Sequence, residues 1–163
     1  MNRKVVENTI GQLRDVQNGI AWYDENFEKK IAPISETQAF ERPIPEIHSV
    51  AELISHIWVW RVDTIKKLKG YESHLTIESP ENWKSNEELK KTGWEKLKKD
   101  LSKSQAELVE FLADKDDDYL ENNTYEGKYT LKYLVEGILH HDLYHLGQIG
   151  ITIKLLNIKN NVS

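Results

Sequence analysis

Residues 130–157, TLKYLVEGILHHDLYHLGQIGITIKLLN, are the stretch that decides the fold. They form an extended apolar run and carry three of the six histidines in the chain. On a helix, side chains four residues apart lie one turn above each other, with Cβ atoms about 5–6 Å apart, so His141 and His145 point the same way. Gln148 continues that face. The stretch therefore predicts a long helix that presents two imidazoles on one side.

Two imidazoles at this spacing can bind one metal ion while the backbone stays a regular helix. The spacing alone is weak evidence, because six histidines scattered over 163 positions give about 0.2 such pairs by chance. A metal site needs a third ligand from elsewhere in the chain.

The length, net charge and composition of the chain limit the classes of protein to which it can belong. A length of 163 residues suits a single domain, 1–163, with a core of its own, and the net charge of −5 opposes sequence-independent binding of nucleic acid. No stretch approaches the length of a membrane span, and the N-terminus lacks the apolar segment of a signal peptide. The absence of cysteine excludes disulfides, thiolate metal ligands and a cysteine nucleophile. These features together predict a cytoplasmic protein with no membrane or nucleic-acid partner.

Helical periodicity recurs in three further segments, at about 3–28, 49–70 and 85–115. Two of them begin with a capping box, Ser49 to Glu52 and Ser85 to Glu88, in which a serine hydroxyl and a glutamate satisfy each other's backbone amides. Four helices with connectors of this length predict an all-α four-helix bundle, with segments 49–70 and 130–157 as neighbours.

The segments between the predicted helices are expected to form connectors, a turn and a short hairpin. Residues 31–48 hold three prolines and form a connector, and residues 71–84 form a loop that contains an exposed His74. The acidic run 116–118 is predicted to be a solvated turn, and residues 119–121 and 125–129 to pair as a short hairpin before the last helix.

Two features of the apolar pattern concern packing. Trp22 and Tyr23 are predicted to pack in the core or at its rim. Segment 130–157 contains three glycines, which are predicted to allow close packing against another helix: Gly137, Gly147 and Gly150. The apolar positions of segments 49–70 and 130–157 cover more than one stripe, which predicts a second buried face and thus a homodimer.

The candidate third ligand is His56, which lies on the apolar stripe of segment 49–70 and must find a hydrogen bond or a metal there. If His56 faces His141 and His145, three nitrogens form one side of a metal shell and leave the other side open. A bound water or thiol would then lose its proton more readily than in bulk solvent. Around this triad, Gln148, Trp60 and Asp142 are candidates for supporting contacts or pocket walls.

Two motifs are characteristic of one known family: residues 49–57, SVAELISHI, and residues 141–149, HDLYHLGQI. With these motifs, the chain resembles the DinB family over nearly its whole length. The resemblance implies a four-helix bundle, commonly dimeric, with His56, His141 and His145 as ligands of one divalent ion, nickel or zinc before manganese, iron or cobalt. It also implies thiol S-transferase activity of the bacillithiol or mycothiol type, beside other metal-dependent reactions. Leu146 stands where the family often has arginine.

Other kinds of site fit the sequence less well. HDLYH lacks the glutamate that serves as general base in HExxH peptidases, and a carboxylate di-iron bundle needs paired Glu-x-x-His motifs that are absent here. His140 lies on another face of the helix from His141, so a packing role is favoured over metal binding.

Two hypotheses of different class follow. The first is a metal-dependent enzyme that joins a small-molecule thiol to an electrophile, with a metal-dependent hydrolase as its variant. The second is a non-catalytic, dimeric interaction protein in which the metal is structural. The sequence names no catalytic residue beyond the metal ligands.

Overall fold

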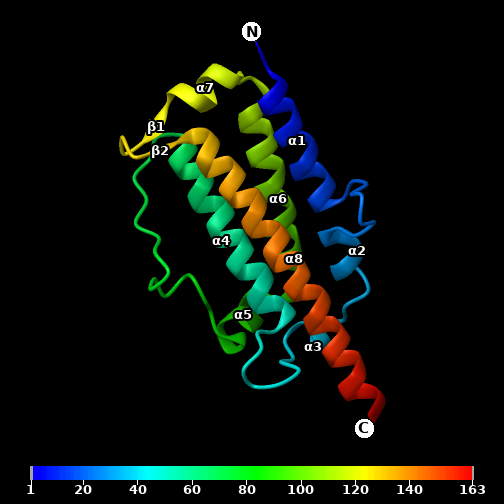
Figure 1. Ribbon diagram of the computed structural model, residues 1–163. Coiled ribbons are helices and arrows are strands. Elements are labelled where there is room, and N and C mark those ends of the chain that lie inside the picture. The colour runs from blue at the N-terminus through cyan, green and yellow to red at the C-terminus, as the bar shows by residue number, and fades with distance from the viewer. Residues whose placement is uncertain (1, 163) are drawn as a thin grey trace.

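The computed structural model describes residues 2–162. Its four long helices form a bundle (Figure 1): α1 Lys4–Gln17, α4 Val50–Leu68, α6 Trp94–Ala113 and α8 Leu131–Val162. Shorter elements connect them: α2 Phe27–Ile31, α3 Glu36–Ala39, α5 Asn86–Thr92, α7 Asp117–Asn122, and an antiparallel pair of β1 Thr124–Tyr125 with β2 Tyr129–Thr130. The predicted all-α four-helix bundle is confirmed.

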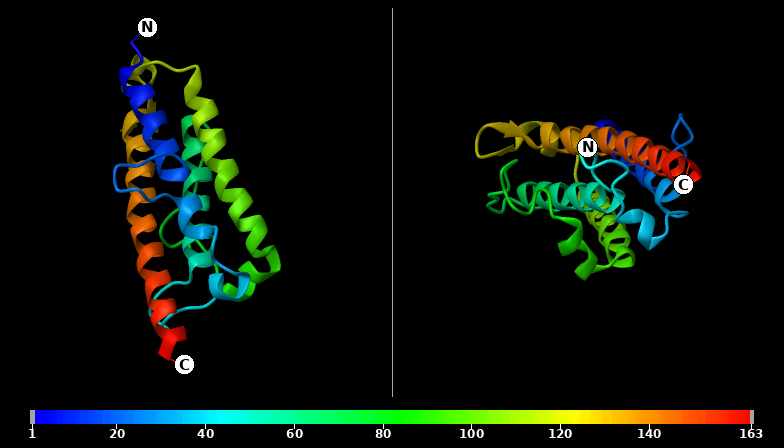
Figure 2. Two further views of the ribbon diagram at one scale, coloured as in Figure 1. Left: turned by 90° about the vertical axis from the view of Figure 1, so that its right-hand side faces the viewer. Right: turned by 90° about the horizontal axis from the view of Figure 1, so that it is seen from below.

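Helix α4 is the central element, because its contacts with α6 and α8 are the most extensive between helices of the bundle. Its side chains Leu53, Ile54 and Ile57 are buried in the core. Both predicted signals at its ends are present: the capping box of Ser49 with Glu52 at the start, and Gly70 with φ of +75° just after the end. Figure 2 shows α4 and α8 side by side along most of their length, as predicted.

The first helix is shorter than predicted. It ends at Gln17, and the amides of Asn18 and Gly19 both donate to the carbonyl of Arg14, which closes the helix. Asn26 then donates to the Gly19 carbonyl and caps α2. The loop between them leaves Trp22 fully exposed, at 101% of its reference area, so the prediction of a packed Trp22 is wrong.

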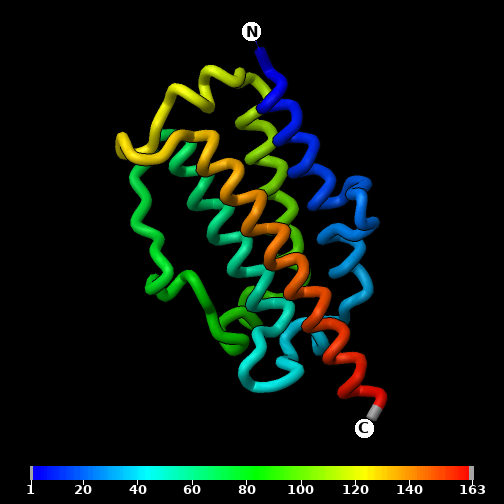
Figure 3. The backbone as a smooth tube through the Cα atoms, viewed as in Figure 1, coloured from blue at the N-terminus to red at the C-terminus, as the bar shows by residue number. Residues whose placement is uncertain are grey.

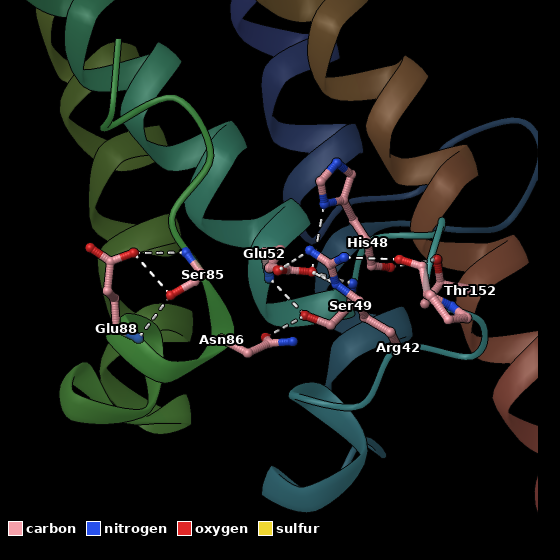
Figure 4. Close-up of polar contacts among 9 residues, drawn as sticks. Arg42, His48, Ser49, Glu52, Ser85, Asn86, Glu88 and Thr152 are labelled. Carbon is pink, nitrogen blue, oxygen red and sulfur yellow. Dashed lines mark hydrogen bonds and ion pairs between the residues drawn. The ribbon is translucent and has the colours of Figure 1, made fainter. Parts of the chain in front are cut away.

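The predicted helix over 85–115 is also interrupted. Gly93 adopts φ of +86°, a conformation that disfavours other residues, and separates α5 from α6. The capping box of Ser85 with Glu88 at the start of α5 is confirmed, as Figure 4 shows.

The acidic run is not simply a solvated turn. Asp117 is buried, and its Oδ1 accepts hydrogen bonds of 3.0 Å from the amides of Val5 and Val6 at the start of α1. It supplies a cap that Arg3, the local N-cap residue, does not. Residues 119–121 lie in α7 rather than in a strand, so the hairpin before α8 consists of β1 and β2 alone.

Contrary to the prediction, no other helix within residues 2–162 packs closely on the glycines of α8. A Cβ added to Gly137 or Gly147 would meet nothing within 4 Å, and one at Gly150 would meet only the Lys30 side chain, at 3.8 Å. These glycines therefore leave open space on the outer side of α8.

The loop after α4 positions part of the site. It runs back along α4 toward α5, as the tube in Figure 3 shows. The Ser73 hydroxyl donates to Asp63 of α4, and the Ser73 amide donates to the Tyr125 hydroxyl at 3.1 Å. His74 is exposed, as predicted. Within residues 2–162, no helix combines the length and apolar character needed to cross a membrane.

Candidate metal centre

Three histidines from two helices converge between α4 and α8. His56 comes from α4, and His141 and His145 come from successive turns of α8. Nε2 of His56 lies 3.0 Å from Nε2 of His141, and one nitrogen from each of the three rings lies within 4.8 Å of the others. A single divalent ion among these nitrogens can bond all three. The convergence predicted from the sequence is present.

Hydrogen bonds fix the protonation of two of the rings. His56 Nδ1 lies 3.0 Å from the backbone carbonyl oxygen of Asn82, and His145 Nδ1 lies 2.7 Å from Oε1 of Gln148. Both oxygens can only accept, so each Nδ1 carries the proton and each Nε2 keeps its lone pair. Metal-binding histidines use this arrangement to hold the ring in one tautomer and orientation.

The ring nitrogens of the third histidine, His141, also suit binding of a cation. Its Nδ1 is buried and has no hydrogen-bond partner among residues 2–162. Its Nε2 faces the lone pair of His56 Nε2, with which it can form a hydrogen bond only if it carries a proton itself. A divalent ion between the rings accepts both lone pairs at once, so the donor set suits a metal.

Burial keeps the imidazoles neutral. It lowers the pKa of His56 to about 4, and burial together with the neighbouring His145, His56 and Arg61 lowers the pKa of His141 to about 3. Burial also lowers the pKa of His145, which the hydrogen bond to Gln148 partly opposes. All three rings are therefore ready to bind a metal at neutral pH without first losing a proton.

Two tryptophans wall the centre. The ring of Trp83 stacks on His56, with 3.9 Å between centroids and 5° between planes. Trp60 lies edge-on to His56, and its indole N–H donates to Oδ1 of Asn82 at 2.8 Å. Because Asn82 also accepts from His56 through its carbonyl, the loop residues 82 and 83 hold the ring of His56 on two sides.

A buried ion pair lies beside the centre. Arg61 of α4 and Asp142 of α8 are both 0% exposed and meet through Nε and Nη2 of the arginine, at 3.0 and 2.9 Å from Oδ2. Nη1 of Arg61 also donates to Gln17 of α1 and to the Leu101 carbonyl of α6. One guanidinium thus links all four long helices.

Of the residues considered beside the triad in the sequence, two contact its histidines and two do not. Gln148 bonds to His145, and Trp60 lies against the centre. Asp142 turns to Arg61 rather than to the imidazoles, and His140 is exposed and is not part of the triad. Asn82, Trp83 and Arg61 were missed. An arginine inside the apolar pattern of α4, five residues after His56, was a signal that could have pointed to a buried partner.

Comparison with known proteins identifies the family and the fold. A model of the DinB superfamily matches residues 21–149, which include all three histidines. A crystal structure described as a conserved protein from Enterococcus faecalis is similar over 93% of this chain and 92% of its own, with a TM-score of 0.60 and 18% identity, which bears on the fold alone. Among curated proteins no match was found. The family match covers most of the chain, and the protein belongs to the DinB superfamily.

Proposed function

We propose that this protein is a divalent-metal-dependent enzyme that transfers a low-molecular-weight thiol of the bacillithiol type to a small electrophile. The observation that carries the proposal is the set of three neutral imidazoles, two of them with fixed tautomers, whose free nitrogens converge. A structural metal site would be closed by a fourth protein ligand, whereas the metal-ligand cluster found among residues 2–162 consists of three histidines.

The ligands would be His56, His141 and His145, with nickel or zinc as the ion. When bound, the ion acts as a Lewis acid that lowers the pKa of a thiol or a water. The neutral histidines add no negative charge, which leaves that effect undiminished. The thiol would lose its proton to solvent, and its sulfur would form a bond to an electrophilic carbon as the bond from that carbon to a halide or to the epoxide oxygen breaks. The halide would leave as an anion, whereas the opened epoxide oxygen would take a proton from solvent.

The chain's own residues prepare the site for this chemistry. Asn82 and Gln148 hold the proton on Nδ1 of two rings and so keep the other nitrogens turned to the centre. The rings of Trp83 and Trp60 cover the His56 side and exclude water there.

Turnover tests the proposal. Protein loaded with Ni²⁺ or Zn²⁺ is mixed with bacillithiol or cysteine and an epoxide or activated aryl halide, and thiol consumption is followed. We expect metal-dependent consumption that a chelator abolishes and that His141→Ala lacks, while His140→Ala, a change at the exposed neighbouring histidine, retains it. Bound metal without thiol consumption would contradict the proposal. In that case, hydrolysis of compounds from an ester or amide panel would support a metal-dependent hydrolase. Absence of any turnover would support a structural metal.

We also propose a homodimer formed through the outer face of α8. Exposed apolar side chains lie on this helix, Leu143, Tyr144 and Ile151. Leu143 and Ile151 line a groove of about 400 Å³, together with Gly147, Gly150 and Tyr23. An apolar face of this kind is typical of a protein–protein contact.

Sedimentation of paired glycine variants tests the dimer. Gly147→Arg places a charge in the groove, and Gly137→Arg is the matched control, because a Cβ meets open space at both positions. We expect dimeric wild type and control and a monomeric Gly147→Arg. A monomeric wild type, or a Gly147→Arg variant that remains dimeric, would rule this interface out.

A further inference from the structure

A second cavity lies near the histidine triad, on the side toward the N-terminus of α4, and none of the three histidines lines it. It has a volume of about 290 Å³, and its walls come from the connector before α4, from α4 and from α8: Ile47, His48, Leu53, Gln148, Ile151 and Thr152. This volume lies just below the range for small-molecule sites, about 300–1,000 Å³.

Two side chains join this cavity to the triad. Gln148 lines it and accepts from His145 Nδ1 at 2.7 Å. His48 lines it too, and its ring stacks on one face of Trp83 while His56 stacks on the other, each with 3.9 Å between centroids. The cavity is therefore separated from His145 by the side chain of Gln148, and from His56 by the rings of His48 and Trp83.

Buried polar contacts hold the wall formed by the connector in place (Figure 4). Glu52 is buried and accepts from Nε and Nη2 of Arg42, at 2.9 and 2.6 Å, and from the Ser49 amide at 2.8 Å. Burial by itself raises the pKa of Glu52, but these hydrogen bonds outweigh it and lower the pKa. His48 Nδ1 lies 3.6 Å from the same carboxylate, and Thr152 of α8 donates to the His48 carbonyl at 3.4 Å. The cavity is thus a preformed part of the fold.

The lining selects the chemistry of a ligand. Its surface is mainly apolar, from Ile47, Leu53 and Ile151 together with the face of the His48 ring. No lysine or arginine lines it, and the exposed carboxylate of Glu46 lies at its rim. Arg42, the nearby cation, is engaged by Glu52 and by the Pro45 carbonyl. An anionic ligand would find no free positive partner and would meet the charge of Glu46.

We infer that this cavity binds the apolar part of the electrophilic substrate, an uncharged molecule with an aryl or branched alkyl group. This role of the cavity as substrate site rests on the proposed function. Binding of an uncharged aromatic molecule, however, can be measured without turnover.

Amide chemical shifts of ¹⁵N-labelled protein measure that binding. The full chain is titrated with benzyl alcohol and with benzoate, which has a similar shape and a negative charge, once with chelator and once with Zn²⁺. We expect benzyl alcohol to shift the amides of Ile47, Gln148 and Thr152 under both conditions, and benzoate to bind at least about tenfold more weakly.

Two variants of one connector localise the effect. Ile47→Trp fills the cavity and is expected to weaken benzyl alcohol binding about tenfold or more. Ile44→Trp is the control, since Ile44 is an exposed isoleucine of the same connector that does not line the cavity. Unchanged affinity in Ile47→Trp, equal or tighter binding of benzoate, or shifts confined to other residues would each overturn the inference. Loss of turnover with this binding intact would instead count against the proposed transferase alone.

Discussion

Replacing Arg61 by alanine is expected to lower the free energy of unfolding by about 3–5 kcal/mol, the range for breaking a buried ion pair from one side. The change leaves the carboxylate of Asp142 fully buried without its partner. Burial raises the pKa of Asp142, and the guanidinium of Arg61 opposes that rise. The change also removes the hydrogen bonds to Gln17 and to the Leu101 carbonyl. Urea unfolding of metal-free protein measures the loss.

The control for this prediction removes both charges. In the double variant Arg61→Leu with Asp142→Leu, no unpaired charge remains, so we expect much of the stability lost in Arg61→Ala to return. A loss below about 1 kcal/mol in Arg61→Ala would show that water or a rearranged side chain reaches Asp142. The pair would then not be the link among the four helices that the structure indicates.

The second large effect concerns metal binding. His145→Ala removes one of three ligands and is expected to weaken Zn²⁺ binding by more than the roughly 10–100-fold that the loss of a supporting contact costs. Isothermal titration of metal-free protein gives the affinity. His140→Ala serves as the matched control, because it removes an exposed imidazole from the preceding turn of α8 and leaves the triad intact. Equal affinities in the two variants would mean that the triad is not the site of binding.

Local patterns predicted the bundle and the triad, for a physical reason. The steps between apolar residues, the capping boxes at Ser49 and Ser85 and the stop at Gly70 act within a few residues, so they can be read from the sequence. His141 and His145 share a face by helix geometry alone. Placing His56 opposite them required only that two apolar stripes pack together.

Contacts that join distant segments were not predictable in this way. Asn82 and Trp83 meet His56 because the loop after α4 folds back along that helix, and no periodicity encodes such a return. Asp117 caps α1 from more than one hundred residues away along the chain. Trp22 was misplaced because its apolar character suggested burial, whereas the helix had already ended at Gln17.

The central claim is that one divalent ion binds to three imidazoles, and X-ray absorption spectroscopy of Zn²⁺-loaded protein tests it most directly. The account predicts one ion per chain with three imidazole nitrogens at about 2.0–2.1 Å and the remaining positions filled by water or added thiol. A fourth protein ligand, fewer than three imidazoles, or an unchanged spectrum in the His56→Ala variant would contradict it.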